Sequence, residues 1–197
     1  MDNIILIGAG GHARACIDVI ESMGIYKIAG LVEKADFQAI GNLGYSIIGT
    51  DNDLPELRKK YNKALITVGQ IESAGTRVKL FDLISDLKFQ LPVVISPRAH
   101  VSKHSNIGAG TIIMHDALVN VNSIIGQNCI INTKSLIEHD AVVNDHCHIA
   151  TGAIVNGEVT IGRKSFIGSG VVTKQSISIG EKCLIGAGCI IKTNIES

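Results

Sequence analysis

The chain has 197 residues, which is enough for one or two compact domains with a hydrophobic core. Its 18 basic and 18 acidic residues balance to a formal net charge of zero, so no basic surface is indicated for nucleic acid or for anionic membrane. No apolar run reaches the roughly 18 residues that span a bilayer. The first residues, MDNIILIG, lack the basic segment of a signal peptide, so we expect a cytoplasmic protein.

The first part of the chain alternates between strand and helix patterns. A short apolar run at residues 3–7 predicts a buried strand, and apolar residues at helical spacing from 15 to 20 predict a helix that ends at Gly24. Further strands are expected at residues 28–32 and 65–69, and a second helix at residues 77–84. This order is typical of a parallel α/β domain, which we assign to residues 1–92.

The turn after the first strand is rich in glycine and reads Gly8-Ala9-Gly10-Gly11-His12-Ala13. It fits the pattern G-x-G-x-x-G/A, and Glu33 follows at the distance, about 20 residues, of a ribose-binding acid. That pattern alone suggests NAD. However, the domain is about half as long as a full dinucleotide fold, and a glycine turn at a helix N-terminus holds any phosphate. One nucleotide, carried by a nucleotide-sugar, therefore fits better, and His12 beside it favours ligand contact.

A six-residue repeat begins at Ile95. Of the seventeen positions reached by steps of six up to Ile191, sixteen are Ile or Val and none is Leu. The residues four positions further on are nearly all small. This is the hexapeptide signature of a parallel β-helix, in which three hexads, about 18 residues, form one triangular coil. We assign residues 93–197 to this second domain. Four cysteines occupy the position of the hexad where small residues recur, so we interpret them as reduced packing residues: Cys129, Cys147, Cys183 and Cys189.

Three histidines gather in IEHDAVVNDHCH, residues 137–148. An acid stands on each side of His139, and a carboxylate near an imidazole raises its basicity and orients its tautomer. This favours a general base over a metal ligand. His146 is interpreted as a solvated corner residue. A metal site requires three or four converging ligands, so a hydratase of the γ-carbonic anhydrase type, with His139, His146 and His148 on zinc, is an alternative.

The whole chain resembles the sugar O-/N-acyltransferase family that contains the bacterial sialic acid O-acetyltransferases and the UDP-4-amino-sugar N-acetyltransferases of bacillosamine synthesis. The matching stretches are ILIGAGGHA, ITVGQ and INTKSLIEHDAVVNDHCHIATGAIVNGEVTIG. The resemblance implies that the β-helix is left-handed and forms a homotrimer, with acetyl-CoA in the groove between neighbouring helices. It also implies that the N-terminal domain holds the nucleotide-sugar substrate over that groove.

The resemblance further implies roles for individual residues. His139 would be the general base, Asp140 the acid that raises its basicity, and Glu138 an orienting group. Asn132 resembles a polar active-site residue. The residues that would contact acetyl-CoA are His148, Gly157 and Ser169. The residues that would contact the phosphates of the nucleotide-sugar are Gly10, Gly11 and His12, and those that would line the uridine side are Glu33, Lys34 and Gly69.

Two features depart from the family pattern. The family often ends in a G-x-P-A-K-like tail that helps to cover CoA, whereas this sequence ends in CIIKTNIES, and Glu33-Lys34 stands where an acidic pair is often found. We expect direct, metal-free transfer of an acetyl group from acetyl-CoA to the 4-amino group of a UDP-linked amino-deoxy-sugar. The alternatives are O-acetylation of a sialic acid, the metal hydratase, and a catalytically silent trimeric scaffold.

Overall fold

A computed structural model of the chain describes residues 1–34 and 42–197. The chain divides into two compact units. The first consists of residues 1–69 and 75–92, and the second of residues 70–74 and 93–197. The short segment Gln70–Ala74 thus belongs to the second unit, although the chain on both sides of it belongs to the first. Each helix among the described residues is too short or too polar to cross a bilayer.

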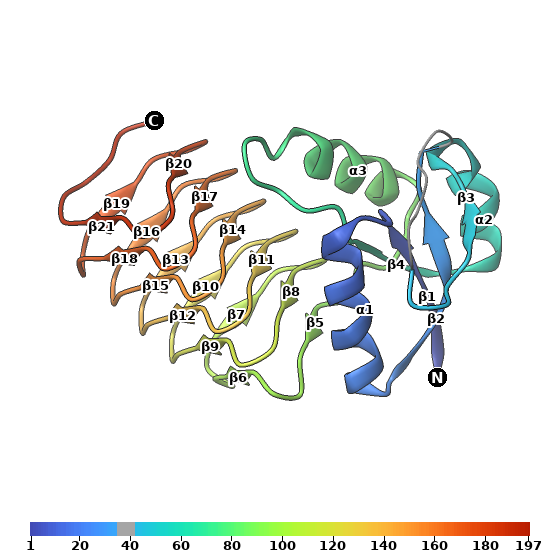
Figure 1. The fold of residues 1–197 in the computed structure, drawn as a ribbon, viewed down its shortest axis with the longest axis horizontal. Coiled ribbons are helices and arrows are strands. Elements are labelled where there is room, and N and C mark those ends of the chain that lie inside the picture. The colour runs from blue at the N-terminus through green and yellow to red at the C-terminus, as the bar shows by residue number, and fades with distance from the viewer. Residues whose placement is uncertain (35–41) are drawn as a thin grey trace. The chain divides into compact units, whose positions relative to one another are not determined.

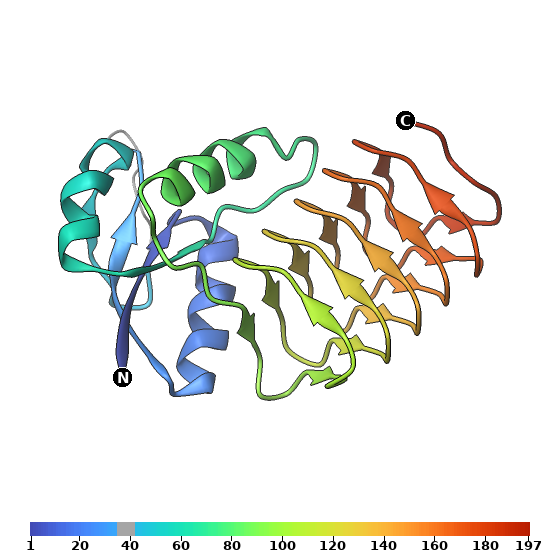
Figure 2. The same ribbon diagram turned by 180° about the vertical axis from the view of Figure 1, so that it is seen from behind.

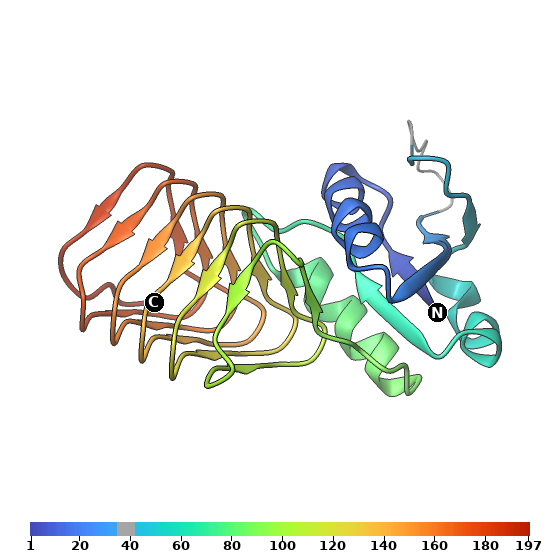
Figure 3. The same cartoon turned by 90° about the horizontal axis from the view of Figure 1, so that it is seen from below.

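The first unit is a four-stranded parallel sheet with helices, so the expected parallel α/β fold is confirmed. The sheet order is β3-β2-β1-β4. In chain order the elements are β1 (Asp2–Ile7), α1 (Gly11–Met23), β2 (Tyr26–Val32), β3 (Ile47–Gly49), the 3-10 turn Asp51–Asp53, α2 (Leu54–Lys60), β4 (Lys63–Ile66) and α3 (Gly75–Asp86). Figure 3 shows α1 in blue and α3 in green on opposite faces of the sheet.

Strand β1 lies at the centre of this sheet. Residues 4–7 are at most 1% exposed, which is why the strand is a continuous apolar run and does not alternate with polar residues. Gly8 follows with φ +115°, and a Cβ there would lie 2.8 Å from the backbone nitrogen of Val68, so only glycine fits this turn. Helix α1 ends at Gly24, whose φ of 66° makes a left-handed C-cap.

The second unit is a left-handed parallel β-helix, as predicted (Figures 1 and 2). Its two-residue strands are β5 (Val94–Ile95), β6 (His100–Val101), β7 (Asn106–Ile107), β8 (Ile112–Ile113), β9 (Leu118–Val119), β10 (Ile124–Ile125), β11 (Ile130–Ile131), β12 (Leu136–Ile137), β13 (Val142–Val143), β14 (His148–Ile149), β15 (Ile154–Val155), β16 (Thr160–Ile161), β17 (Phe166–Ile167), β18 (Val172–Thr173), β19 (Ser178–Ile179), β20 (Leu184–Ile185) and β21 (Ile190–Ile191). Three parallel sheets result, β19-β16-β13-β10-β7, β20-β17-β14-β11-β8-β5 and β21-β18-β15-β12-β9-β6. Paired residues, such as Ile124 and Val142, are 18 positions apart, which is the predicted coil length.

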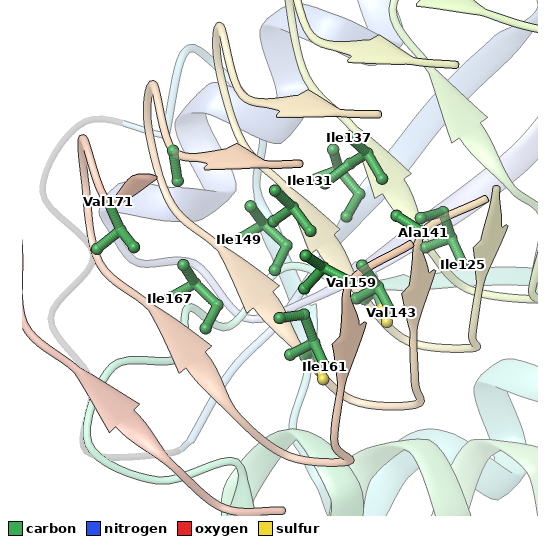
Figure 4. Packing of buried hydrophobic residues seen from close by; sticks show 14 of the residues in the cluster. Ile125, Ile131, Ile137, Ala141, Val143, Ile149, Val159, Ile161, Ile167 and Val171 are labelled. Carbon is green, nitrogen blue, oxygen red and sulfur yellow. The ribbon is translucent and has the colours of Figure 1, made fainter. Parts of the chain in front are cut away.

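The second residue of each strand points into the β-helix. Figure 4 shows these branched side chains stacked in its interior, where Ile131, Ile137 and Ile149 are completely buried. Strands this short are held by the coils above and below, so the aliphatic ladder and the backbone bonds between coils stabilise each other. Cys129 and Cys147 are buried packing residues as predicted, whereas Cys189 is exposed. All five cysteines are free.

Candidate active site

The turn Glu138-His139-Asp140 links β12 to β13 and forms one corner of the β-helix. Asp140 adopts a left-handed backbone conformation (φ 60°), as do Asn122 and Glu158, which lie 18 residues before and after it. The Asp140 N–H donates to the carbonyl of Val121, and the Glu158 N–H donates to the carbonyl of His139. The coils on both sides therefore fix the backbone of this turn.

The His139 ring is bonded to the neighbouring carboxylate. Its Nδ1 lies 2.8 Å from Oδ2 of Asp140. An ionised carboxylate only accepts hydrogen bonds, so Nδ1 carries the proton and Nε2 is the basic atom of the neutral ring. The hydrogen bond to Asp140 raises the pKa of His139, with smaller contributions from the charges of Glu138 and Glu158. The side chain is 55% exposed, so Nε2 lies where a substrate can approach.

Asparagines of the preceding coil hold the two acids beside His139. Nδ2 of Asn122 donates to Oδ1 of Asp140 at 2.6 Å, and Nδ2 of Asn120 donates to Oε2 of Glu138 at 2.8 Å. The bond from Asn122 is the main reason that the pKa of Asp140 is lowered, and the bond from His139 adds to it. Asp140 thus stays ionised and keeps one oxygen for the imidazole. Oε2 of Glu138 also accepts a bond from the backbone N–H of His139, which supports its predicted orienting role.

The His139 side chain lines a cavity of about 470 Å³ on the β-helix. The cavity is lined by three consecutive coils at the same corner, through Glu138, His139, Asn156, Gly157, Glu158, Gln175 and Ser176. Two carboxylates line it, and Oε2 of Glu158 accepts a bond from the Ser176 hydroxyl at 2.7 Å. The cavity therefore favours a cationic or hydrogen-bond-donating group beside the imidazole, such as an amine.

Asn132 and His148 form a second polar group away from the His139 turn: Asn132 directly follows β11, and His148 is the first residue of β14, which pairs with β11. Nδ2 of Asn132 lies 3.1 Å from Nε2 of His148, and Nδ1 of His148 lies 2.6 Å from the carbonyl oxygen of Gln70. A carbonyl only accepts, so Nδ1 carries the proton of His148 and Nε2 accepts from Asn132. This pins His148 as a neutral imidazole, 7% exposed, with its ring edge-on to Phe166.

The interpretation of His146 as a solvated corner residue is wrong. Its side chain is 3% exposed, and its Nδ1 lies 3.0 Å from Nδ2 of Asn128. Its backbone carbonyl accepts a bond from Nε2 of Gln70 at 3.0 Å. The hexad frame placed His146 at a corner, but Gln70 lies 76 residues earlier in the chain, and no periodic pattern connects the two.

The residues predicted to bind the nucleotide gather where the parallel strands of the first unit end. Helix α1 begins at Gly11, with Gly10 as its N-cap, and Gly69 lies next to His12. The carboxylate of Glu33 is bonded to this loop and accepts from the Ala9 N–H at 2.7 Å. Ala9 is therefore already satisfied, and the carboxylate places a negative charge where a phosphate would approach.

The remaining predicted residues belong to different units of the chain. Lys34 is exposed and donates its backbone N–H to Glu33. Gly157 is buried below the His139 ring, whereas Ser169 is exposed at the corner that carries Asn132. Within residues 1–34 and 42–197, no group of three or more His, Cys, Asp or Glu side chains is arranged to hold a metal ion. The three histidines of the alternative metal site point to separate partners.

Comparison with known proteins agrees with this architecture. Residues 3–82 match the PglD N-terminal domain, and residues 158–193 match the hexapeptide repeat of succinyl-transferase. No curated protein sequence matches the chain. Among solved structures, the acetyltransferase domain of PglB from Neisseria gonorrhoeae in complex with acetyl coenzyme A is 30% identical, with a TM-score of 0.90 over 99% of this chain and 93% of that one.

The chain belongs to the hexapeptide-repeat acyltransferase family. The expectation of an acyl-CoA-dependent acetyltransferase is thereby confirmed. PerB from Caulobacter crescentus, solved with CoA and GDP-perosamine, is 29% identical to this acyltransferase, with a TM-score of 0.91 over 100% of this chain and 92% of that one. WeeI from Acinetobacter baumannii, at 18% identity and a TM-score of 0.81 over 100% of this chain and 94% of that one, shares the fold.

The sequence did not indicate four contributors to these two groups, namely Asn120, Asn122, Glu158 and Gln70. Asn120 lies 18 residues before Glu138, and Asn122 and Glu158 lie 18 residues before and after Asp140, so an 18-residue offset from the two acids beside the proposed base would have found all three. Gln70 ends the matching stretch ITVGQ, but nothing in the sequence shows that it packs on the β-helix. The family resemblance included this stretch but implied no role for Gln70.

Replacing Asp140 with asparagine tests the origin of the raised pKa of His139. We expect the pKa of His139, followed by NMR of its ring, to fall toward its ordinary value, because the carboxylate charge is lost. A base acts only when it is unprotonated, so the acidic limb that His139 contributes to the pH profile of kcat/KM should move to lower pH. A weaker base should also lower the plateau roughly 10- to 100-fold.

Asp116→Asn is the matched control for that experiment. Asp116 has the same left-handed turn conformation (φ 59°) but pairs with Arg98 at another corner. It should leave both the pKa of His139 and the pH profile unchanged. An unchanged pKa of His139 in Asp140→Asn would contradict the assignment of Asp140 as its partner.

Proposed function

We propose that the protein transfers the acetyl group of acetyl-CoA to the 4-amino group of a nucleotide-linked amino-deoxy-sugar, with UDP as the nucleotide. The observation that carries this proposal is the His139–Asp140 pair. It presents a basic Nε2 atom to an acid-lined cavity in a member of the hexapeptide-repeat acyltransferase family. The relatives solved with CoA and GDP-perosamine or with acetyl coenzyme A support the donor and the class of acceptor.

His139 acts as the general base in a direct transfer. The amine nitrogen attacks the thioester carbonyl carbon, Nε2 of His139 takes a proton from that nitrogen, and the C–S bond breaks to release CoA, which receives the proton. Asp140 stabilises the imidazolium that forms between these two proton transfers. Binding both substrates together supplies much of the rate enhancement, and the base adds about 10²- to 10⁴-fold.

The acidic lining of the cavity suits an amine acceptor. A sugar amine is partly protonated near neutral pH, and Glu138 and Glu158 attract this cation. The raised pKa of His139 makes it a better acceptor for the proton that the amine must lose. A hydroxyl gains less from this charge, and that difference favours N-acetylation over O-acetylation of a sialic acid.

Asn132 serves as a hydrogen-bond donor to the thioester carbonyl. Its Oδ1 accepts from the Thr133 N–H, and one N–H of its amide points to His148, so the amide is held in a fixed orientation with a second N–H to donate. His148 positions Asn132 and borders the acetyl-CoA site together with Ser169. A donor aimed at the developing oxyanion is worth roughly 10²- to 10³-fold in rate.

The protein works as a homotrimer, because His139 and Asn132 lie at different corners of one chain and a neighbouring copy has to bring them together. The outward residues of the sheet between these corners support an interface: Leu118, Leu136, Ile154 and Val172 are half-buried and Ile190 is exposed. Such an apolar column on a sheet face is typical of a surface that packs on another subunit. Acetyl-CoA lies in the groove between the two copies.

The nucleotide-sugar is held by the glycine turn of the first unit. Gly10, Gly11 and His12 contact its phosphates at the N-terminus of α1, and Glu33, Lys34 and Gly69 lie on the side of the base. Because Glu33 already accepts from Ala9, its negative charge directs the phosphates toward the other N–H groups of the turn.

The decisive experiment measures acetyl transfer to a panel of acceptors. We expect release of the CoA thiol, with a product heavier by one acetyl group, when a UDP-4-amino-sugar is supplied with acetyl-CoA. GDP-linked 4-amino-sugars test the nucleotide, and free and CMP-linked sialic acids test the alternative O-acetyltransferase. Turnover of sialic acids alone would overturn the proposal, and turnover of the GDP-sugar alone would correct the nucleotide.

A further inference from the structure

Gly157 lies directly below the ring of the proposed base. It follows His139 by 18 residues and occupies the same corner position in the next coil. A Cβ at residue 157 would lie 2.8 Å from Cε1 and 2.9 Å from Nε2 of His139, closer than Cβ atoms approach other heavy atoms in proteins. The position of the His139 ring therefore requires a residue without a side chain at 157.

The requirement at Gly157 is steric, and it does not come from the backbone. The φ of Gly157 is not in the left-handed region, so alanine fits its backbone conformation. Other glycines of the β-helix differ in this respect. A Cβ at Gly108 or Gly162 would meet backbone atoms of the next coil at 2.4–2.5 Å, where glycine is needed for the coils to stack. At Gly157 the nearest atoms are those of the His139 ring.

We propose that Gly157 is a positioning residue that sets where Nε2 of His139 points. The inference rests on the proposed role of His139 as general base. More than half of the His139 side chain is exposed, so its surroundings leave it room to rotate. The bond to Asp140 fixes Nδ1. Because Gly157 has no side chain, the ring can lie against the backbone at residue 157. The two contacts together define the direction in which the basic lone pair faces the cavity.

Gly157→Ala should displace the ring without unfolding the protein, because an exposed ring can swing away from the new methyl group. We expect kcat to fall by roughly 10- to 100-fold, since a shift of about 1 Å in a reacting group costs on that scale. The KM for acetyl-CoA should change little. The pKa of His139, measured by NMR, should fall toward its ordinary value, because the ring loses its bond with Asp140.

Gly186→Ala is the matched control. Gly186 also lies in a turn of the β-helix, without a left-handed φ, and the nearest atom to a Cβ there is Sγ of Cys189 at 3.8 Å. This variant should keep the kcat and the His139 pKa of the native protein. It shows whether an added methyl group in a turn of the β-helix is harmful in itself.

A double-mutant cycle separates positioning from a direct contact with the cofactor. In a His139→Ala background, Gly157→Ala should cost no further activity, because the ring that it displaces is absent. An equal loss in both backgrounds, or a rise confined to the KM for acetyl-CoA, would show that Gly157 acts through the cofactor and would overturn the inference. So would an unchanged kcat and His139 pKa in the single variant.

The NMR measurement keeps this inference distinct from the proposed function. If His139→Ala retained its activity, the role of His139 as base would fail. A shifted His139 pKa in Gly157→Ala would then still report the displaced ring, so the two failures can be told apart.

Discussion

Replacing His139 with alanine should lower kcat by about 10²- to 10⁴-fold, the contribution expected of a general base. The side chain is 55% exposed and lies outside the hydrophobic core of the β-helix, so its removal leaves the β-helix folded. The KM for acetyl-CoA should stay close to the native value, because the loss arises in the transition state. Steady-state kinetics and the unfolding temperature of the same preparation measure both effects.

His104→Ala is the control for this variant. His104 is exposed at the same corner of the β-helix, two coils before Asp140, and its carbonyl accepts from the Asn122 N–H. Losing its ring should leave kcat unchanged. A His139→Ala enzyme with turnover within a few-fold of native would rule out the general-base assignment.

Mixing two inactive variants shows whether the site lies between subunits. Asn132→Ala and His139→Ala each lose one side of the proposed site, and mixed trimers contain junctions in which an intact His139 meets an intact Asn132 of the neighbouring chain. In a cyclic trimer assembled at random from equal amounts, roughly a quarter of the junctions are of this kind. We expect that fraction of native activity after joint refolding. No recovery in trimers that have mixed would contradict a shared site.

The β-helix could be predicted from the sequence because the same constraint acts on every coil. Each inward position must fill the same space, so Ile or Val recurs at steps of six. The positions of the strands, the coil length and the corners all follow from this repeat, and no distant contact has to be known. The corner that carries His139 follows from the same count. In the first unit, a continuous apolar run indicated β1 and helical spacing indicated α1, but β3 (Ile47–Gly49) and α2 (Leu54–Lys60) are too short to give a comparable signal.

The parts that the sequence could not predict depend on residues far apart in the chain. Gln70 lies more than 70 residues before both His146 and His148. Its side-chain amide donates to the backbone carbonyl of His146, and its backbone carbonyl accepts from the ring of His148, so it helps to bury the first and to fix the second. Glu33 likewise bonds to Ala9 across two strands of the sheet, a contact that spacing alone suggested only as ribose binding. Hydrogen bonds of this kind leave no repeat in the sequence, so only the folded chain reveals them.

Truncating the aliphatic ladder should produce the largest loss of stability. Ile149 is completely buried and is paired with Ile131 in the coil before it and with Ile167 in the coil after it. Ile149→Ala removes three carbon atoms from a closely packed interior and leaves a cavity that the rigid coils cannot close. We expect the free energy of unfolding to fall by about 2–5 kcal/mol, measured by denaturant titration at one fixed protein concentration.

Leu184→Ala provides the comparison, because Leu184 belongs to the same sheet and repeat but is 55% exposed. Surface truncations usually change the free energy of unfolding by less than about 0.5 kcal/mol. The physical claim is that inward stacking, and not the hexad pattern as such, holds the coils together. Equal losses in the two variants would contradict it, because outward and inward aliphatic residues would then contribute alike. A large loss confined to Ile149→Ala would instead identify the stacked inward residues as the main source of stability of the coils.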